Sequence, residues 1–348
     1  ALEIMESLYP SYELVRKVGD GAFGEVYEGR EVESGNVVAV KLTKLGALRE
    51  HVPKAILREL WSLQLLSCEK NPFIIKYLTH YAYQSHLALV FVFRDLDVQK
   101  LCQDLNGLGI NGTRAVARMT LAALAHIHSH SLMHRDLKPS NLLINSDLGI
   151  VELADFGQCR PIVNDQPCMQ YENHSDFEQN RHDMTHQVST RWYRAPELLF
   201  GARRYSQAID LWGVGVVLAE LIANLPLFPG ASDLDQLIRI FRLRGSPTTE
   251  RWPSAVNLPD FDKIHFPDTP PTPLNIEKGL TKAPTHTVQL LDALLQLEPT
   301  KRPTALTAFS FHFFQLAPPA SDPFIIKILI DRRRTQQQKM KKSSSTDD

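Results

Sequence analysis

Cysteine is scarce in this sequence, and charge of one sign is not in excess. The 348 residues include 4 cysteines, with no Cys-x-x-Cys pair and no spacing typical of a disulfide framework, so we expect a reducing compartment, the cytoplasm and nucleus. Lys and Arg number 38 against 39 Asp and Glu, which gives a formal net charge of −1. The chain therefore lacks the global basic field that would indicate nucleic acid as a partner, and we expect none. The cysteines are Cys68, Cys102, Cys159 and Cys168.

Long apolar runs are also missing. The first ten residues contain acidic side chains and no apolar core of a signal peptide. The most membrane-like stretch, Leu211–Phe228, is interrupted by Glu220, Asn224 and Pro226. These interruptions favour a buried helix of a large domain, and we expect no membrane span.

The hydrophobic pattern changes along the chain. Valines cluster between turn signals over Tyr12–Leu42, which is typical of strands, and further strand-like runs cover Ile74–Tyr83 and His86–Phe93. From His51 the apolar residues follow helical spacing, and beyond about Asp97 the chain becomes mostly helical. One apolar stripe at helical spacing consists of Val116, Met119, Ala123 and Ile127.

These patterns predict an α+β protein of two lobes, because the chain is too long for one simple core. We expect a small β-rich lobe with one main helix over residues 1–94 and a larger, mostly helical lobe over residues 95–318. Residues 319–348 are basic and serine-rich, which predicts a disordered tail. Their basic clusters fit either a nuclear localisation patch or a solvated end.

A glycine-rich run, Gly-x-Gly-x-x-Gly-x-Val, lies among the first strands. Dinucleotide-binding folds use similar glycines to open a helix, but here Glu25–Val32 continues as a strand and turns back. The glycines therefore lie at the tip of a hairpin, where a backbone without Cβ atoms can cover the phosphates of a nucleotide. A glycine-rich hairpin without a ligand is the alternative. The residues are Gly19, Asp20, Gly21, Ala22, Phe23, Gly24 and Val26.

Lys41 ends the apolar strand Val38–Lys41, and Glu59 lies beside the apolar face of the following helix. A lysine in this position is usually a solvated strand end, but a carboxylate near a buried face needs a partner. We predict a Lys41–Glu59 ion pair that directs the ammonium at the phosphates.

The segment His134–Asn141 carries the strongest local signal. Asp136 can accept the proton of an incoming hydroxyl, and Lys138 can neutralise charge on a transferred phosphoryl group. Asn141 and Asp155 can hold Mg²⁺, a hard cation that prefers oxygen ligands.

Together with Ala195-Pro196-Glu197, these motifs resemble the protein-kinase signature over roughly residues 10–315. The resemblance implies the bilobal kinase fold, ATP and Mg²⁺ as cofactors, and Lys41, Glu59, Asp136 and Lys138 as catalytic residues. It implies that Asp210 braces the catalytic loop and that Arg302 pairs with Glu197. It further implies a nucleotide pocket that includes Val26, Ala39, Lys41, Phe91 as gatekeeper, Val92, Phe93 and Arg94 as hinge, Asp97 at the ribose, and Leu143.

The helix Pro53–Glu59 and the segment Thr185–Glu197 resemble cyclin-dependent kinases, specifically the cell-cycle-related kinase and the CDK-activating kinase branches. Leu258–Ile264 favours the first branch. This resemblance implies protein substrates, which include other kinases, a cyclin or cyclin-like activator as a candidate partner, and a role in ciliary assembly, intraflagellar transport or cell-cycle signalling. The cilium is then a further candidate location.

Thr185 matches the activating phosphosite of these kinases. Its phosphate would be received by Arg58, Arg135 and Arg160, which come from three different elements. The alternative is three unrelated surface arginines. Residues 163–183 form an insertion relative to the family, which fits a mobile loop better than a metal site of His174, His182 and His186.

Two rival functions remain open in the sequence. A transcription-linked CDK-activating kinase would act on different substrates. A pseudokinase scaffold would bind partners without transferring phosphate, although none of the base or metal-binding residues is lost.

Overall fold

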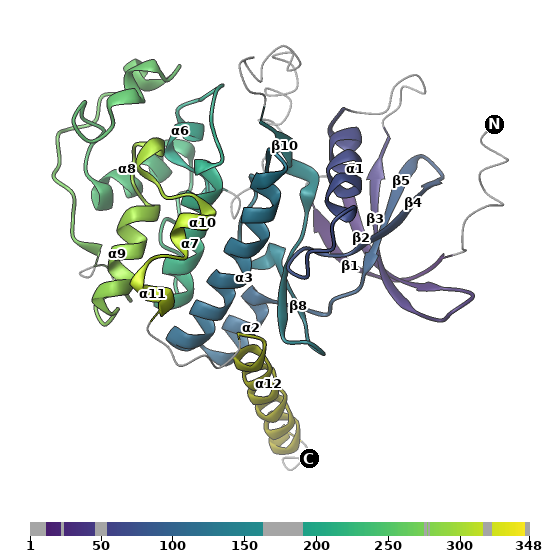
Figure 1. The fold of residues 1–348 in the computed structure, drawn as a ribbon. Helices are drawn as coiled ribbons and strands as arrows, with labels where there is room; N and C mark the ends of the chain where they lie inside the picture. Colours follow the sequence, from purple (N-terminus) through teal and green to yellow (C-terminus); the bar gives the residue numbers. More distant parts are fainter. Residues whose placement is uncertain are drawn as a thin grey trace.

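The computed structural model describes residues 12–21, 24–45, 54–162, 191–274, 277, 279–315 and 322–344. Within them the chain forms a β-rich lobe followed by a larger helical lobe (Figure 1). In this view the sheet and the helix α1 lie at the right, α3 lies in the middle, and α6 to α11 lie at the left. The predicted α+β, two-lobed fold is confirmed.

The N-terminal lobe contains a five-stranded antiparallel sheet in the order β1-β2-β3-β5-β4. Its own small core packs Val38, Val40 and Leu42 of β3 against Ala88 and Val90 of β5. Side chains alternate along a strand, so these core residues leave Ala39 and Lys41 on the opposite face of β3. The strands are β1 (Tyr12–Gly21), β2 (Gly24–Glu31), β3 (Val37–Lys44), β4 (Tyr77–Tyr83) and β5 (His86–Val92).

Helix α1 (Lys54–Ser67) follows β3. Ile56 and Leu63, which follow the predicted helical spacing, are buried, and Leu60 is partly buried. The predicted strand from Ile74 begins later than expected, at Tyr77. Ile74 instead makes an isolated parallel bridge to Leu153, which connects this segment to the other lobe.

The C-terminal lobe is built around two long helices. The predicted stripe on α3 is buried along its whole length, and α7 buries its residues on nearly all sides, as expected for the interrupted apolar stretch. The main core of the molecule lies here. The helices of this lobe are α2 (Val98–Leu105), α3 (Gly109–Ser129), α6 (Pro196–Leu199), α7 (Ala208–Ala223), α8 (Asp233–Arg244), α9 (Thr285–Leu294), α10 (Ala305–Ala308) and α11 (His312–Gln315).

Short strands at the junction of the lobes carry the loops of interest. β6, β8 and β9 form a three-stranded sheet, and β7 pairs with β10. Between these strands the chain makes 3₁₀ turns at Pro139–Asn141 and Phe156–Gln158, which include the last residues of two predicted catalytic motifs. The strands are β6 (Leu96–Asp97), β7 (Leu132–Met133), β8 (Leu142–Asn145), β9 (Ile150–Leu153) and β10 (Arg160–Pro161).

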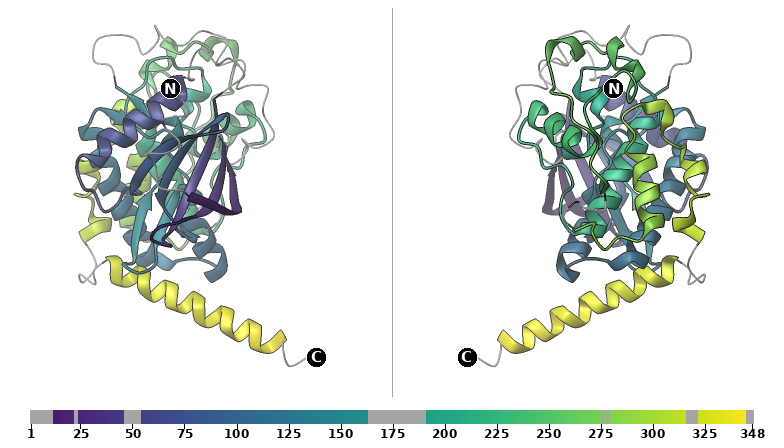
Figure 2. Two further views of the ribbon diagram at one scale, coloured as in Figure 1. Left: turned by 90° about the vertical axis from the view of Figure 1, so that its right-hand side faces the viewer. Right: turned by 90° about the vertical axis from the view of Figure 1, so that its left-hand side faces the viewer.

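The prediction of a disordered tail is wrong over α12 (Asp322–Ser344). The first half of this helix buries Ile326, Leu329 and Ile330, and Asp322 pairs with Arg118 of α3 at 3.3 Å. The second half projects away from the lobe (Figure 2). The basic composition of the tail concealed a short apolar face that precedes the Arg and Lys clusters.

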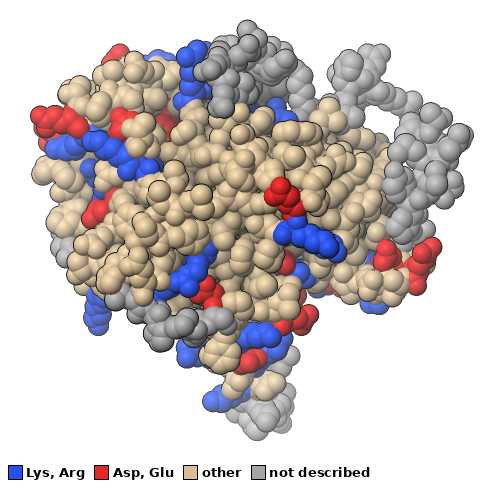
Figure 3. Space-filling model, viewed as in Figure 1, with Lys and Arg blue, Asp and Glu red and all other residues tan. Residues whose placement is uncertain are grey.

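Charges are mixed on the surface. Figure 3 shows acidic and basic side chains interspersed on the face it displays, in line with the near-zero net charge. Among the described residues, no helix combines the length and the apolar character needed to cross a membrane.

Candidate active site

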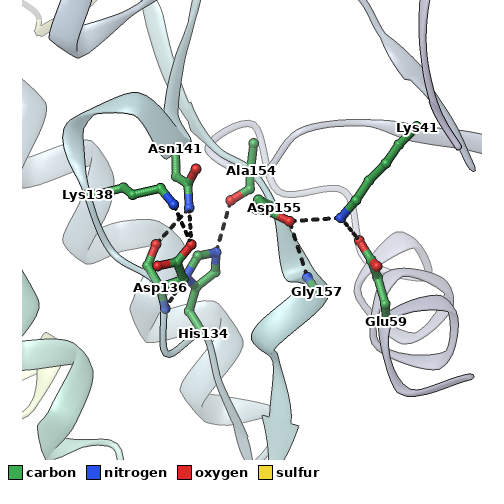
Figure 4. Close-up of polar contacts among 9 residues, drawn as sticks. All are labelled: Lys41, Glu59, His134, Asp136, Lys138, Asn141, Ala154, Asp155 and Gly157. Atoms are coloured by element: carbon green, nitrogen blue, oxygen red, sulfur yellow. Dashed lines mark hydrogen bonds and ion pairs between the residues drawn. The ribbon is translucent and has the colours of Figure 1, made fainter. Parts of the chain in front are cut away.

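Lys41 lies at the centre of a buried charge cluster between the lobes (Figure 4). Its Nζ donates to Oε1 of Glu59 at 2.6 Å and to Oδ1 of Asp155 at 2.9 Å. Lys41 and Glu59 are buried, with 7% and 2% of their surface exposed. The predicted ion pair is therefore present, and it also includes the carboxylate of the Asp-Phe-Gly segment, which sequence reasoning had not joined to it.

Electrostatics favour the charged forms of Lys41 and Asp155. Burial opposes ionisation of Lys41, but the carboxylates of Asp155 and Glu59 outweigh it and raise the pKa of the ammonium. Burial likewise raises the pKa of Asp155, while the charge and hydrogen bond of Lys41 more than compensate and lower it to about 2. Asp155 is therefore a carboxylate at any physiological pH.

The catalytic-loop side chains converge on Asp136. Lys138 Nζ donates to Oδ2 of Asp136 at 2.7 Å, and Asn141 Nδ2 donates to the same oxygen at 3.0 Å and to the Asp136 carbonyl at 2.7 Å (Figure 4). Within the described part of the chain, these hydrogen bonds use Oδ2 of the Asp136 carboxylate and Nδ2 of the Asn141 amide. One oxygen of Asp136 thus remains for a substrate hydroxyl, and one oxygen of Asn141 remains for a cation.

Asp210 braces this loop, as the resemblance implied. From the buried first turn of α7, its carboxylate accepts the backbone N–H groups of His134 at 2.9 Å and Arg135 at 2.8 Å. A third donor, His128 Nε2 at 2.9 Å, was not anticipated. Arg135 has a φ of 71°, a left-handed conformation that costs energy for a residue with a side chain. The two backbone hydrogen bonds hold that turn in place.

His134 links the two catalytic segments, a role that sequence reasoning missed. Its Nε2 donates to the carbonyl of Ala154 at 3.0 Å, and its ring packs edge-on against Phe156 with centroids 5.2 Å apart. Asp155, which lies between Ala154 and Phe156, has a φ of 64°. In the sequence, the position of His134 beside Arg135 and Asp136 was the signal for such a role. Only the fold shows that His134 faces the other loop.

The glycine run forms the tip of the predicted hairpin. Gly21 of β1 pairs with Gly24 of β2, and Ala22 and Phe23 between them lie outside the described residues. A Cβ on Gly24 would lie 2.1 Å from the Leu42 carbonyl oxygen, so this position requires glycine. Val26 lies opposite Lys41 in the neighbouring strand, and the hairpin therefore lies next to the charge cluster.

The predicted nucleotide pocket residues are partly placed. Phe91 and Val92 end β5, Leu143 of β8 lies opposite Asp97 of β6, and Asp97 caps α2 by accepting the Lys100 N–H at 2.7 Å. Arg94 turns to β9, where it makes a two-pronged ion pair with Glu152 at 2.8 and 2.9 Å. Its backbone, with that of Phe93, stays the predicted hinge.

The predicted pair of Arg302 and Glu197 is present and fully buried. The guanidinium donates to both carboxylate oxygens at 2.7 and 2.8 Å, and its Cζ lies 5.1 Å from the centre of the Trp212 ring. This pair fixes the end of the segment that begins at Asp155 to the C-terminal lobe.

Thr185, the insertion 163–183 and the three histidines considered for a metal site lie outside the described residues. Of the three arginines, Arg135 has Nε and Nη1 buried without a hydrogen-bond partner among the described residues, and its guanidinium stacks on Tyr205 at 5.3 Å. Arg160 of β10 pairs with Met133, two residues before Arg135. Arg58 lies beside Glu59 on α1.

The donor set fits a nucleotide with a divalent cation. The carboxylate of Asp155 and the amide oxygen of Asn141 are hard oxygen ligands, and the Ala154 N–H bond to the Asn141 carbonyl, 2.9 Å, holds their segments together. Lys41 supplies the positive charge that phosphate groups need.

Similarity to known proteins covers nearly the whole chain. A family model described as the protein kinase domain matches residues 12–314. Cyclin-dependent kinase 20 of Pongo abelii is 35% identical over 313 residues, which cover 90% of this chain and 85% of the relative. Cyclin-dependent kinase 7 of Xenopus laevis is 38% identical over 311 residues, 88% of this chain and 82% of the relative. Cyclin-dependent kinase D-1 of Oryza sativa subsp. indica is 36% identical over 307 residues, which cover 88% of this chain and 67% of the relative.

Proposed function

Because the chain belongs to the protein kinase domain family, as a cyclin-dependent-kinase-like Ser/Thr protein kinase, we propose that it phosphorylates other kinases in ciliary assembly or cell-cycle signalling, with Mg-ATP as donor. The observation that supports phosphate transfer most directly is the cluster of Lys41, Glu59 and Asp155 next to Asp136. Every predicted base and cation-binding residue is present, which argues against a pseudokinase scaffold.

The residues act on the reacting groups in distinct ways. Asp136 accepts the proton of the substrate hydroxyl, and Lys138, 2.7 Å from it, balances charge on the transferred group. Lys41 holds the phosphates, and Glu59 fixes the position of the ammonium. Asp155 and Asn141 would hold Mg²⁺, which would supply charge neutralisation at the phosphates.

A purified preparation with radiolabelled ATP tests this assignment. Asp136→Asn should lower phosphate transfer to a generic protein substrate by about 10²–10⁴-fold, the typical contribution of a catalytic base. Asp147→Asn, an exposed carboxylate in the turn between β8 and β9, is the matched control and should transfer at the wild-type rate. Equal labelling by Asp136→Asn and wild type would refute the role of Asp136.

The finer function rests on similarity to cyclin-dependent kinase 20, while similarity to cyclin-dependent kinase 7 carries the alternative of a transcription-linked CDK-activating kinase. A direct comparison separates them. The purified enzyme is given the activation segment of a ciliary kinase or that of a cyclin-dependent kinase, and a higher kcat/KM on the first supports our proposal. A preference for the second favours the alternative. Adding a cyclin to the same assay tests whether an activator is required.

We also propose that phosphorylated Thr185 docks on Arg58, Arg135 and Arg160. Two observations support this: buried nitrogens of Arg135 have no partner among the described residues, and the β7–β10 register brings Arg160 near Arg135. A phosphate there would order α1 and both loops together. Thr185→Ala should lower activity, and full activity in this variant, relative to a preparation phosphorylated only at Thr185, would refute the proposal.

A further inference from the structure

A group of three metal-ligating side chains lies away from the catalytic residues. Glu69 follows α1, whereas His126 lies in the last turn of α3 and His130, four residues further on, is the C-cap of that helix. Their ligand atoms all lie within 4.8 Å of one another. Histidines at this spacing project from the same face of a helix, so both rings can reach one ion.

The separations suit a bound ion better than direct hydrogen bonds. Nδ1 of His126 lies 3.7 Å from Oε2 of Glu69, and Nε2 of His130 lies 3.7 Å from Oε1. These distances are too long for hydrogen bonds. Two ligands of a tetrahedral Zn²⁺, each about 2.0–2.1 Å from the ion, are about 3.4 Å apart. Small side-chain movements would therefore complete the coordination.

The hydrogen bonds of His130 present the correct nitrogen. Its Nδ1 faces two oxygens, the carbonyl of His126 at 2.9 Å and the hydroxyl of Ser129 at 3.3 Å. The Ser129 hydroxyl itself donates to that carbonyl at 2.7 Å, so Nδ1 carries the proton. Nε2 then offers its lone pair toward Glu69. A backbone carbonyl that fixes the free nitrogen is the usual arrangement around zinc-bound histidines.

His126 has no hydrogen-bond partner in the described part of the chain. Its Nε2 is buried and unpaired, and its side chain is 13% exposed. Nδ1, the nitrogen that faces Glu69, is therefore open to a ligand. Glu69, 65% exposed, leaves the cluster open to solvent, so an ion can enter and a water can fill the fourth position.

We propose that Glu69, His126 and His130 bind one Zn²⁺ ion. Imidazole ligands favour such a borderline metal over Mg²⁺ or Ca²⁺, which prefer oxygen alone. The ion would connect the segment after α1, the helix that carries Glu59, to α3 of the other lobe.

Zinc titration of the full chain tests this site. The protein is freed of metal by a chelator and titrated with Zn²⁺ against a coloured competitor, in excess Mg²⁺ to occupy oxygen sites. We expect one tight equivalent. His126→Ala, His130→Ala and Glu69→Gln should each weaken binding at least about tenfold. His265→Ala removes an exposed histidine elsewhere and should bind as wild type does.

Thermal unfolding supplies a second readout that does not depend on activity. Zn²⁺ should raise the Tm of wild type and of His265→Ala, but not of His130→Ala or Glu69→Gln. Because Glu69 is exposed, Glu69→Gln keeps the metal-free fold and remains decisive if a histidine variant unfolds. No zinc uptake by wild type in excess Mg²⁺, or equal uptake by wild type and Glu69→Gln, would overturn the proposal.

Discussion

Arg302→Ala tests how the buried ion pair with Glu197 stabilises the end of the segment that begins at Asp155. Arg302 has a fully buried side chain, and it donates to both oxygens of Glu197, which is 4% exposed. Loss of the guanidinium would leave a buried carboxylate without a partner, which costs about 3–5 kcal/mol. The carbonyls of Ala208, Gln296 and Leu297 would also lose a donor. We therefore expect Arg302→Ala to lower the free energy of unfolding by an amount in the upper part of that range.

Denaturant unfolding followed by tryptophan fluorescence measures this loss, since Trp212 stacks on Arg302. Arg204→Ala, an exposed arginine of the same lobe, is the control and should change the free energy of unfolding by less than about 0.5 kcal/mol. The double variant Glu197→Leu with Arg302→Met removes both charges and should recover about 2 kcal/mol or more relative to Arg302→Ala. A loss below about 1 kcal/mol for Arg302→Ala, or no recovery in the double variant, would refute the reasoning.

Three further predictions follow from the same structure. Lys41→Met should lower kcat about 10²–10³-fold, and it should shift the acid loss of stability to higher pH. The sign follows from Asp155, whose pKa of about 2 lies below its value in the unfolded chain, so its contribution to stability is complete above about pH 4 and is lost as the pH falls toward 2. Without Lys41, burial raises the pKa of Asp155, and this contribution is lost at a higher pH. Unchanged curves of Tm against pH would contradict this reasoning. Leu329→Ala should lower the free energy of unfolding by about 2–4 kcal/mol because α12 buries this side chain against the lobe. Ile328 of the same helix is 46% exposed, so Ile328→Ala should cost little, and equal unfolding midpoints for the two variants would contradict the packing of α12. A thiol reagent at pH 7.5 should label exposed Cys68 well before Cys159, because burial raises the pKa of Cys159 to about 12; peptide mass spectrometry that finds Cys159 labelled first would contradict it.

Much of the site could be predicted from the sequence because its motifs are local. Asp136, Lys138 and Asn141 lie within one short loop, and the apolar spacing around Glu59 already required a partner for its carboxylate. Contacts between distant segments were less accessible. The hydrogen bond of His134 to Ala154 and the ion pair of Arg94 with Glu152 depend on how the short strands of the junction pair.

The tail shows where composition misleads. Three buried apolar residues of α12 outweigh the basic clusters that follow, because they pack on α3 where Gly112 leaves room: a Cβ there would lie 2.7 Å from Leu329 Cδ1. A reading of residues 319–348 by charge alone cannot detect a face that only this tertiary contact stabilises.

The most direct test of the central claim is to locate the cation. Crystals of the wild-type protein with Mn²⁺ and a non-hydrolysable ATP analogue would be measured by anomalous diffraction, since Mn²⁺ accepts the same oxygen ligands as Mg²⁺. We predict an anomalous peak in contact with the carboxylate of Asp155 and the amide oxygen of Asn141, with Lys41 on the nucleotide phosphates. A peak elsewhere, with both side chains free of metal, would contradict the account.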